Sequence, residues 1–471
     1  MIQTIINQQP ETLELPTGAI LLDIIREKLQ LKGTKEACRE GDCGSCMVLW
    51  GKPINGIMKY QAVNSCLFAI AEANRSHIVT IEGINGSALN PIQELIIEEG
   101  ASQCGFCTPG FIISMLAYFL SAKTIDLKSA IASLSGNICR CTGYASIIRV
   151  VEGLCSLPNP EAFEASFESK RVEFLVEIGF LPAYFLQIPQ MIDSIPNPEQ
   201  TIPPTSATVL MGGGTDLYIQ KEDETSVSEV YCTGMNDELK GIYISDNKCF
   251  IGSATTVTEL AENELIEQII PGFSKTIALI SCPSIRNRAT LGGNLVNASP
   301  IGDLTIIFLA MNATVVLRDK NNIREVALSD FFLDYKKLDK KPDEYMESLF
   351  FPIPKHKILF NFEKVSKRIH LDIASVNSAV MIELNDGIIE NICLSAGGVA
   401  PIPLSLIKTA DFLKKKENSL SNFKKAAEIA MTEIKPISDV RGTAEYKKLL
   451  LKQLILLHYT ELFPKEIGIQ N

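Results

Sequence analysis

The cysteines of this 471-residue chain constrain its fold more than any other feature, because eight of the thirteen fall into two sets near the N-terminus. The two sets are Cys38, Cys43, Cys46 and Cys66, and then Cys104, Cys107, Cys139 and Cys141. A C-x4-C-x2-C run with a distant fourth cysteine is the spacing of a plant-type [2Fe–2S] ferredoxin, and each iron of such a cluster takes two thiolates. Two complete sets of four therefore predict two [2Fe–2S] clusters, and two clusters in one chain indicate electron transfer.

Structural zinc is the main alternative, since four-cysteine zinc sites are common. Zinc usually takes paired C-x2–4-C knuckles, which the spacing of the first set does not match. From spacing alone, the C-x2-C and C-x-C pairs of the second set leave a zinc site open. A Rieske centre needs two histidines, and none of the four histidines lies within the cysteine motifs. The remaining cysteines are scattered singly and are expected to be small buried hydrophobes: Cys155, Cys232, Cys249, Cys282 and Cys393.

Composition places the chain among ordinary globular proteins, with 46% hydrophobic and 21% charged residues. The net charge of −11 argues against a nucleic-acid or anionic-membrane partner. The longest largely apolar run, Phe111 to Leu120, is about half as long as a bilayer span, and the N-terminus lacks the pattern of a signal peptide. Thiols that serve as metal ligands must stay reduced, so we expect a cytoplasmic protein without a membrane segment.

Local patterns predict an α+β multidomain chain. Residues 1–82 alternate short strands with one amphipathic helix, which fits a β-grasp ferredoxin domain, and residues 83–155 form a helical domain around the second cysteine set. Residues 156–184 show no clear period and are expected to be a linker. Residues 185–362 mix strands, helices and glycine-rich turns, and residues 363–471 are expected to form a C-terminal α+β domain.

The helical domain is expected to place the second cysteine set at helix termini. Thr108 and Pro109 are the N-cap and first-turn proline of a predicted helix over 110–121. Further helices are expected over 126–134 and 146–154. Backbone N–H groups at such termini can face sulfide and thiolate, so this arrangement suits an iron–sulfur cluster.

Two glycine-rich segments of the middle region look like a phosphate cradle for a nucleotide. The first follows an apolar run and consists of Leu210, Met211, Gly212, Gly213, Gly214, Thr215, Asp216 and Leu217. The second contributes Thr290, Gly293, Asn294, Asn297 and Asp303, whose polar side chains suit ribityl or ribose hydroxyls. Glycines let backbone N–H groups close on a pyrophosphate, but neither segment matches G-x-G-x-x-G or the Walker loop. Taken singly, such a glycine run is more often an ordinary tight turn.

The order of these motifs resembles that of the molybdenum hydroxylases, the xanthine oxidase/dehydrogenase family. The resemblance rests on the first cysteine set and on the segments QCGFCTPG (103–110), GNICRCTGY (136–144), GGTDL (213–217), IRNRATLGGNL (285–295) and ASPIGDL (298–304). It covers nearly the whole chain. In its arrangement the chain is similar to the small subunit of bacterial xanthine dehydrogenases, in which both iron–sulfur domains and the FAD domain share one polypeptide.

This resemblance implies FAD, bound by the two glycine-rich segments in a domain over 185–362, and it makes the second cysteine set a [2Fe–2S] site. It also implies a large partner subunit with the molybdopterin cofactor, in a heterodimer or a dimer of heterodimers. Electrons would pass from there through the cluster of the second set, then that of the first set, to FAD and on to NAD. Gln103 would approach the pterin, within a docking face that includes Gly105 and Arg140.

Hydroxylation of a substrate is expected to need that partner, because only about a hundred residues follow the flavin region. Xanthine is favoured over aldehydes, nicotinate or other heterocycles, because fused cluster-and-flavin small subunits are typical of xanthine dehydrogenases. NAD and oxygen both stay open as the final acceptor. The alternatives are a stand-alone iron–sulfur flavoprotein reductase and a zinc-stabilised nucleotide-binding protein without a redox role.

Overall fold

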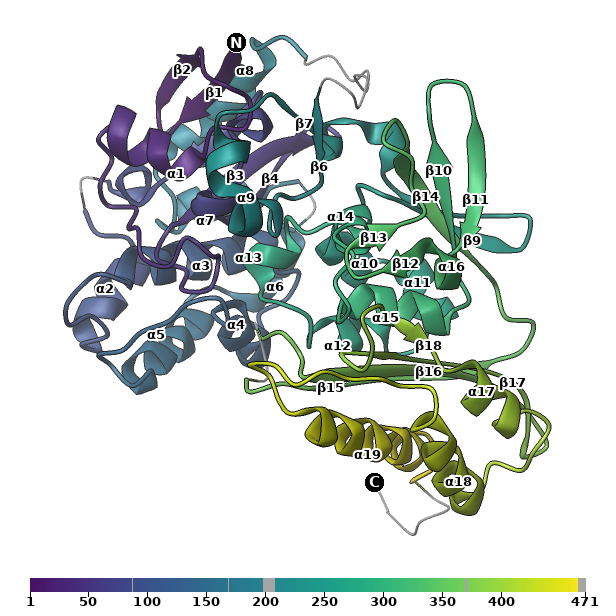
Figure 1. Cartoon of the computed structure of the whole chain (residues 1–471). Helices are drawn as coiled ribbons and strands as arrows, with labels where there is room; N and C mark the ends of the chain where they lie inside the picture. Colours follow the sequence, from purple (N-terminus) through teal and green to yellow (C-terminus); the bar gives the residue numbers. More distant parts are fainter. Residues whose placement is uncertain (87, 168, 198–207, 369–371, 465–471) are drawn as a thin grey trace. The chain divides into compact units, whose positions relative to one another are not determined.

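The computed structural model describes residues 1–86, 88–167, 169–197, 208–368 and 372–464. The chain forms two compact units, whose elements are labelled in Figure 1. The first unit holds Met1–Pro203, Thr208–Met235 and Cys282–Arg288, and the second holds Asn236–Ser281 and Ala289–Asn471. The region expected to bind flavin, 185–362, is thus divided between the two units, and 198–207 within it lie outside the described residues.

A mixed five-stranded sheet opens the first unit, as the β-grasp prediction requires. Its strands are β1 (Ile2–Ile6), β2 (Gln9–Leu13), β3 (Met47–Ile54), β4 (Ile57–Asn64) and β5 (His77–Val79), in the order β2-β1-β5-β3-β4. β1 runs parallel to β5, and the other neighbours are antiparallel. The expected amphipathic helix is a short α1 (Leu21–Asp23) that continues as a π-helical turn. It buries Leu21, Ile24 and Ile25 in the core of this domain.

Four helices follow the sheet, and the last three lie close to their predicted positions. They are α2 (Pro91–Glu98), α3 (Thr108–Ser121), α4 (Leu127–Ser133) and α5 (Ala145–Ser156). The apolar run of α3 is buried in the helical core from Phe111 to Leu120. Its continuous hydrophobicity therefore reflects burial on every side of the helix. Among the described residues, no helix is both long and apolar enough to cross a membrane.

The segment 156–184, predicted to be a linker, instead contains α6 (Pro160–Ala165) and α7 (Arg171–Glu177). Phe163 and Leu175 are fully buried in the same core as α3. The Arg171 guanidinium lies 3.5 Å from the centroid of the Phe163 ring. Helices of 6 and 7 residues show too few turns for a hydrophobic period to emerge, which is why the sequence pattern missed them. Another short helix, α8 (Ile188–Asp193), follows.

Two later segments complete the first unit. They carry β6 (Val209–Met211), α9 (Leu217–Ser226), β7 (Val230–Cys232) and α13 (Pro283–Arg286), with β6 and β7 paired in parallel. The Thr17 hydroxyl donates to the Val230 carbonyl at 2.9 Å and accepts from the Val230 N–H at 2.6 Å. The Tyr218 hydroxyl donates to the Gly18 carbonyl at 2.7 Å. Segments from the expected flavin region therefore fold directly against the ferredoxin-like domain.

The second unit contains two larger antiparallel sheets. The first has the order β11-β10-β14-β9-β8, with β8 (Ile242–Ser245), β9 (Lys248–Gly252), β10 (Thr314–Arg318), β11 (Ile323–Ala327) and β14 (Tyr345–Pro352). The second has the order β15-β16-β17-β18, with β15 (Ile358–Val365), β16 (Val376–Asn385), β17 (Ile388–Gly397) and β18 (Leu404–Ser405). A small hairpin joins β12 (Phe332–Asp334) and β13 (Lys337–Leu338).

Helices cover the sheets of the second unit. They are α10 (Val257–Glu262), α11 (Glu264–Ile269), α12 (Phe273–Ile277), α14 (Leu291–Val296), α15 (Asp303–Ala310), α16 (Leu328–Phe331), α17 (Ile407–Leu413), α18 (Leu420–Ala430) and α19 (Ala444–Leu462). Figure 1 shows α18 and α19 on one face of the β15–β18 sheet and α15 on the other. The α+β multidomain class predicted from the sequence is thereby confirmed.

Candidate iron–sulfur and flavin sites

The first cysteine set comes together as two close pairs of sulfur atoms. Cys38 Sγ lies 3.3 Å from Cys43 Sγ, and Cys46 Sγ lies 3.3 Å from Cys66 Sγ. The first pair lies in the loop before β3, and Cys66 lies in the 3-10 turn after β4. Electrostatic interactions also link Cys43 with Cys46 and Cys38 with Cys66, so the four thiols share one site.

The paired arrangement bears on which metal group the first set would hold. A [2Fe–2S] cluster takes two protein thiolates at each of two irons, and the two thiol pairs supply these four ligands. The donor set of the first site fits that cluster.

Each pair of the first set couples a more acidic thiol to a less acidic one. The pKa of Cys43 is lowered to about 5, chiefly by its hydrogen bond with Cys38, while the same bond and burial raise the pKa of Cys38. The hydrogen bond with Cys66 lowers the pKa of Cys46, and that bond together with burial raises the pKa of Cys66. Each pair therefore joins a thiol of lowered pKa to one of raised pKa, and binding of a metal requires loss of the thiol protons.

The second cysteine set forms two pairs as well. Cys104 Sγ and Cys141 Sγ lie 3.6 Å apart, and Cys107 hydrogen-bonds with Cys139. Cys107 lies at the N-terminus of α3 and is its N-cap, whereas Thr108, the predicted N-cap, is the first residue of the helix. The Thr142 N–H donates to Cys139 Sγ at 3.5 Å, and the Thr142 hydroxyl lies 3.2 Å from that sulfur.

The pKa values of the second set also alternate. Burial alone would raise the pKa of Cys139, but hydrogen bonds from Thr142 lower it on balance. The pKa of Cys104 is lowered chiefly by a hydrogen bond from the Phe106 N–H and, to a smaller extent, by a hydrogen bond with Cys141. Burial and Cys139 raise the pKa of Cys107 to about 12. Both sets thus combine thiols of lowered pKa with thiols of raised pKa, although the cysteines are spaced differently in the sequence.

The loops that carry the two sets touch through their backbones. The Ile138 N–H, next to Cys139, donates to the Cys43 carbonyl at 3.0 Å. A Cβ on Gly44 would lie 2.4 Å from the Gly136 carbonyl oxygen, and a Cβ on Gly110 would lie 2.1 Å from the Gly44 carbonyl oxygen. Glycine is required at these points because no side chain fits between the loops. The two candidate cluster sites are therefore directly adjacent.

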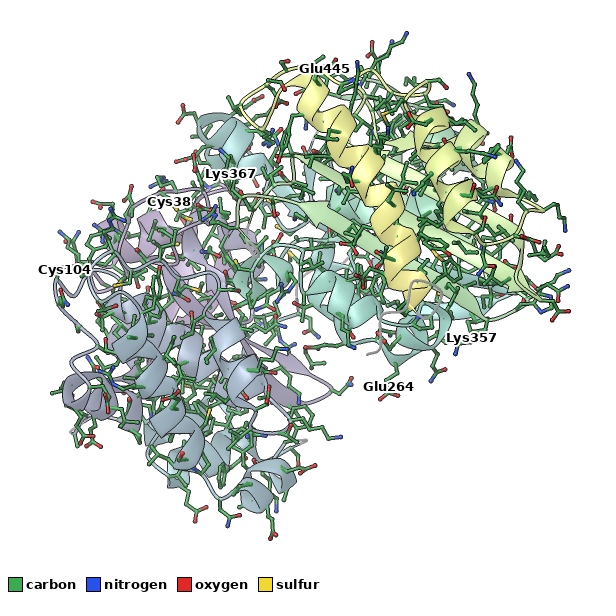
Figure 2. The ribbon with its side chains drawn as sticks, turned by 90° about the horizontal axis from the view of Figure 1, so that it is seen from below. Cys38, Cys104, Glu264, Lys357, Lys367 and Glu445 are labelled. Carbon is green, nitrogen blue, oxygen red and sulfur yellow. The ribbon has the colours of Figure 1, made fainter. Side chains whose placement is uncertain are left out.

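The two sets differ in their exposure. Cys46 and Cys66 are buried, whereas Cys104 and Cys141 are exposed. The exposed surface around the second set includes Gln103, Phe106, Ile138, Arg140 and Tyr144. Figure 2 labels one cysteine of each set, and both lie in the first unit. Gly105, which the sequence placed on the same face, is half-buried with a φ of +77°.

The first glycine-rich segment is a strand–turn–helix in the first unit. The apolar run before the glycines forms β6, the turn runs over 212–216, and α9 begins at Leu217. Gly214 has a φ of +73°, and a Cβ there would lie 3.0 Å from Met211 Sδ. The Gly213 carbonyl accepts from the Arg288 guanidinium at 3.0 Å. A glycine turn between a strand and a helix N-terminus is an arrangement that fits a phosphate group.

The second glycine-rich segment lies in the second unit, around α14 and the start of α15. The Thr290 hydroxyl caps α14 by accepting from the Gly293 N–H at 3.0 Å. Asn294 Oδ1 accepts from the Thr305 hydroxyl at 3.4 Å, and the Asn297 side chain accepts from Lys336 Nζ at 2.8 Å. Part of the hydrogen-bonding capacity of these predicted site residues is thus used within the unit.

Asp303 has two partners that sequence reasoning missed. Lys364 Nζ donates to its Oδ2 at 2.7 Å, and Asn377 Nδ2 donates to its Oδ1 at 2.5 Å. The Lys364 side chain is only 4% exposed. Asp303 therefore holds Lys364 and Asn377 in place through its carboxylate. The partners lie 61 and 74 residues away along the chain, beyond the reach of any local motif.

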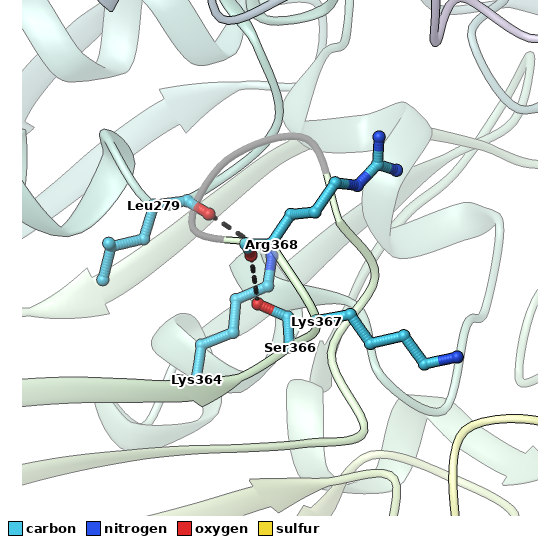
Figure 3. Close-up of a pocket in the computed structure, with 5 residues that line it drawn as sticks. All are labelled: Leu279, Lys364, Ser366, Lys367 and Arg368. Atoms are coloured by element: carbon cyan, nitrogen blue, oxygen red, sulfur yellow. Dashed lines mark hydrogen bonds between the residues drawn. The ribbon is translucent and has the colours of Figure 1, made fainter.

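A cavity of about 220 Å³ opens beside Lys364 (Figure 3). Its lining residues are Leu279, Lys364, Ser366, Lys367 and Arg368. Lys364 also donates to the Leu279 carbonyl at 3.3 Å, and the Ser366 hydroxyl donates to the Arg368 carbonyl at 2.7 Å. Of its three cationic side chains, Lys364 is ion-paired with Asp303 and Arg368 lies 3.8 Å from Asp372, so part of the positive charge at the cavity is neutralised.

The scattered cysteines largely match their expected role. Cys232, Cys249 and Cys282 are buried, and Cys155 and Cys393 are half-buried. Burial raises the pKa of each of these thiols. A buried thiol with a raised pKa is a poor nucleophile and metal ligand.

Four family models match the chain in succession. They are a 2Fe-2S iron-sulfur cluster binding domain at residues 4–67, a [2Fe-2S] binding domain at 80–152, the FAD binding domain in molybdopterin dehydrogenase at 192–354, and the CO dehydrogenase flavoprotein C-terminal domain at 362–462. The chain therefore carries two [2Fe–2S]-binding domains and an FAD-binding domain. The ambiguity over zinc at the second cysteine set is thereby removed.

Individual relatives match large parts of the chain. A xanthine dehydrogenase of Oryza sativa is 29% identical over 86% of this chain and 35% of its own length. An aldehyde oxidase 1 of Bos taurus is 26% identical over 97% of this chain and 38% of its own length. The chain thus spans little more than a third of these curated relatives. A solved structure of the carbon monoxide dehydrogenase of Hydrogenophaga pseudoflava matches 55% of this chain and 90% of its own chain, with 25% identity and a TM-score of 0.52.

Proposed function

This chain belongs to the molybdenum hydroxylase family, and on that premise we propose that it relays electrons from the molybdenum cofactor of a partner subunit to FAD and NAD. When bound, the [2Fe–2S] clusters carry single electrons and the flavin carries one or two. The protein's own part is to hold these groups in order. The adjacency of the two cysteine sets, joined by the hydrogen bond from Ile138 to the Cys43 carbonyl, is the observation that carries the proposal.

The eight cysteines would hold the clusters, four to each. The first cluster is proposed to pass electrons to the flavin, because the β6–α9 segment folds against the domain that holds it. Its ligands would be Cys38, Cys43, Cys46 and Cys66. The second cluster is proposed to receive electrons from the partner subunit, because two of its cysteines are exposed. Its ligands would be Cys104, Cys107, Cys139 and Cys141.

The exposed surface around Gln103 is the proposed docking face for the partner subunit. Exposed Phe106 and Ile138, at 43% and 41%, lie among the exposed polar side chains of Gln103 and Arg140. Apolar groups ringed by polar ones are the usual composition of a protein interface. A permanent heterodimer, or a dimer of such heterodimers, would bury more than roughly 2,000 Å² there.

FAD would be held by the two glycine-rich segments. The turn at Gly212–Gly214 supplies backbone N–H groups for phosphate, and Thr290, Asn294 and Asn297 supply hydroxyl and amide groups. NAD is proposed as the acceptor, with Lys367 and Arg368 beside the Lys364 cavity as candidate contacts for its phosphates. Asp303 would act by positioning Lys364.

The substrate of the partner is proposed to be a purine such as xanthine, with urate as the product. The xanthine dehydrogenases among the relatives favour this substrate. An aldehyde is the second candidate, because an aldehyde oxidase matches a larger share of this chain.

The test is a determination of iron, acid-labile sulfide and FAD in the purified chain, combined with low-temperature EPR of reduced samples. We expect four irons, four sulfides and one FAD per chain, and two distinct EPR signals. Cys43→Ser should perturb one signal and Cys107→Ser the other. Stoichiometric zinc without acid-labile sulfide would overturn the proposal.

A further inference from the structure

A buried ion pair joins the flavin-binding part of the sequence to the ferredoxin-like domain within the first unit. The Arg288 guanidinium binds both carboxylate oxygens of Glu72, with Nη2 at 2.5 Å from Oε1 and Nη1 in contact with Oε2. The side chains are only 3% and 6% exposed. Arg288 follows α13, and Glu72 lies six residues after the cluster ligand Cys66.

The surroundings fix the guanidinium plane. Its central carbon lies 4.3 Å from the centroid of the Phe68 ring and 5.2 Å from that of Trp50. An arginine held by a bidentate carboxylate and by aromatic rings has little freedom to turn. The hydrogen bond from Nη2 to the Gly213 carbonyl, at 3.0 Å, is therefore made from a rigid donor.

This hydrogen bond determines how the glycine turn faces a ligand. In a trans peptide, the carbonyl of one residue and the N–H of the next point in opposite directions. Arg288 draws the Gly213 carbonyl towards itself, so the Gly214 N–H is directed away from the guanidinium. Gly214, with its φ of +73°, can then start the helical turn in which its own carbonyl accepts from the Tyr218 N–H at 3.1 Å.

We propose that Arg288 and Glu72 are positioning residues that orient the Gly213–Gly214 peptide to receive a phosphate of FAD. The inference rests on the proposed role of this turn as the phosphate cradle. It ties the affinity for flavin to the domain that holds the first cluster, because Glu72 belongs to that domain. Neither side chain needs to touch the flavin.

A test must separate this role from simple packing. Replacing both partners by methionine, E72M/R288M, removes the buried charges together and fills the space with apolar groups, which cores usually tolerate. The Gly213 carbonyl then loses its donor. The control is Thr17→Val, which removes the hydrogen bonds to Val230 that join the same segments without reaching the turn.

The measurement is the dissociation constant of FAD, titrated into the deflavinated full-length chain, with ADP as a competing probe. For E72M/R288M we expect both EPR signals and the melting temperature to be retained, while FAD and ADP bind at least about tenfold more weakly. Thr17→Val should keep FAD affinity within about twofold of the wild type. Equal FAD affinity in E72M/R288M and the wild type would overturn the inference, and so would an equal loss in Thr17→Val.

If the double variant does not fold, R288K provides the second arm. Lysine keeps the charge opposite Glu72 but cannot bind both carboxylate oxygens and the Gly213 carbonyl as a planar fork does. We expect weaker FAD binding with both clusters present, and unchanged binding would overturn the inference. A wild-type chain that binds no FAD would instead refute the proposed function itself, so the two failures are distinguishable.

Discussion

The two cysteine sets have the same paired arrangement, but they differ in how far their sulfurs are exposed. Cys46 and Cys66, at 3% and 2% exposed, are enclosed by the ferredoxin-like domain, whereas Cys104 and Cys141 lie at the surface. A cluster enclosed by its own chain is protected without a partner. A cluster at the surface is accessible to a partner and also to solvent. The contrast supports the proposal that the first set takes the internal step of the relay and the second set the external step.

The largest expected effect comes from disturbing the contact between the segments that carry the two cysteine sets. In Gly110→Ala the new Cβ would lie 2.1 Å from the Gly44 carbonyl oxygen, a backbone atom that cannot rotate away. We expect a loss of at least about 2–3 kcal/mol in the free energy of unfolding, with changes in both EPR signals. The measurements are chemical denaturation and EPR.

The matched control for this prediction is Gly56→Ala in the turn between β3 and β4. Gly56 has a φ of +78° but open space around its Cβ position. Only backbone strain of about 1–2 kcal/mol should result, with both EPR signals unchanged. Equal effects of the two substitutions would show that the contact between the loops is unimportant.

The next largest expected effect is a difference in the rates at which the two clusters are lost. In the isolated chain, the cluster of the second set should be lost to an oxidant or a chelator several-fold faster than that of the first set, because exposed thiolates react faster. EPR of samples withdrawn over time measures each signal separately. Binding of the partner subunit should remove the difference. Equal rates in the isolated chain would contradict the contrast in burial.

Cluster loading should depend on pH in a defined direction. Cys38 and Cys66 have raised pKa values, so they enter the site as thiols and must release protons on binding iron. The affinity for iron should therefore fall as the pH falls from about 8. It should fall more steeply below the pKa of Cys43, about 5, since that thiol then also becomes protonated. Reconstitution yield across a pH series measures this dependence, and a flat profile would contradict it.

The smallest expected effect concerns the reduction potential of the second cluster. Thr142→Val removes the hydroxyl that lies 3.2 Å from Cys139 Sγ. Hydrogen bonds to ligand sulfur stabilise the reduced, more negative state. Their loss should lower the potential by about 40 mV, equivalent to ~1 kcal/mol for one electron. A redox titration followed by EPR measures the shift, and the first-set signal serves as the internal control.

The sequence predicted the parts of the molecule that local spacing determines. The cysteine sets and the helix that follows Cys107 were recognised from residues that are close in the chain, although the helix begins at Thr108, the residue predicted as its N-cap. The pair of Glu72 and Arg288 was not found, because its members are 216 residues apart and neither belongs to a recognisable motif. The partners of Asp303 were missed for the same reason.

Local sequence patterns also did not predict how the chain divides into two units. The expected flavin region was treated as one block over 185–362, yet Thr208–Met235 and Cys282–Arg288 fold with the ferredoxin-like domain. Only tertiary packing shows this, since Thr17 and Tyr218 form their hydrogen bonds across some 200 residues of sequence. The domain limits at 82, 155, 184 and 362 accordingly stay predictions.

The most direct test of the relay is rapid-freeze EPR of this chain in complex with its molybdenum-bearing partner, mixed with xanthine and, in a second arm, with an aldehyde. The proposal predicts that the signal assigned to Cys104, Cys107, Cys139 and Cys141 develops no later than that of the first set, and that flavin reduction follows. The isolated chain should show no reduction by either substrate. Reduction of the isolated chain by xanthine, or flavin reduction in a complex whose second cluster has been removed by Cys107→Ser, would contradict the account.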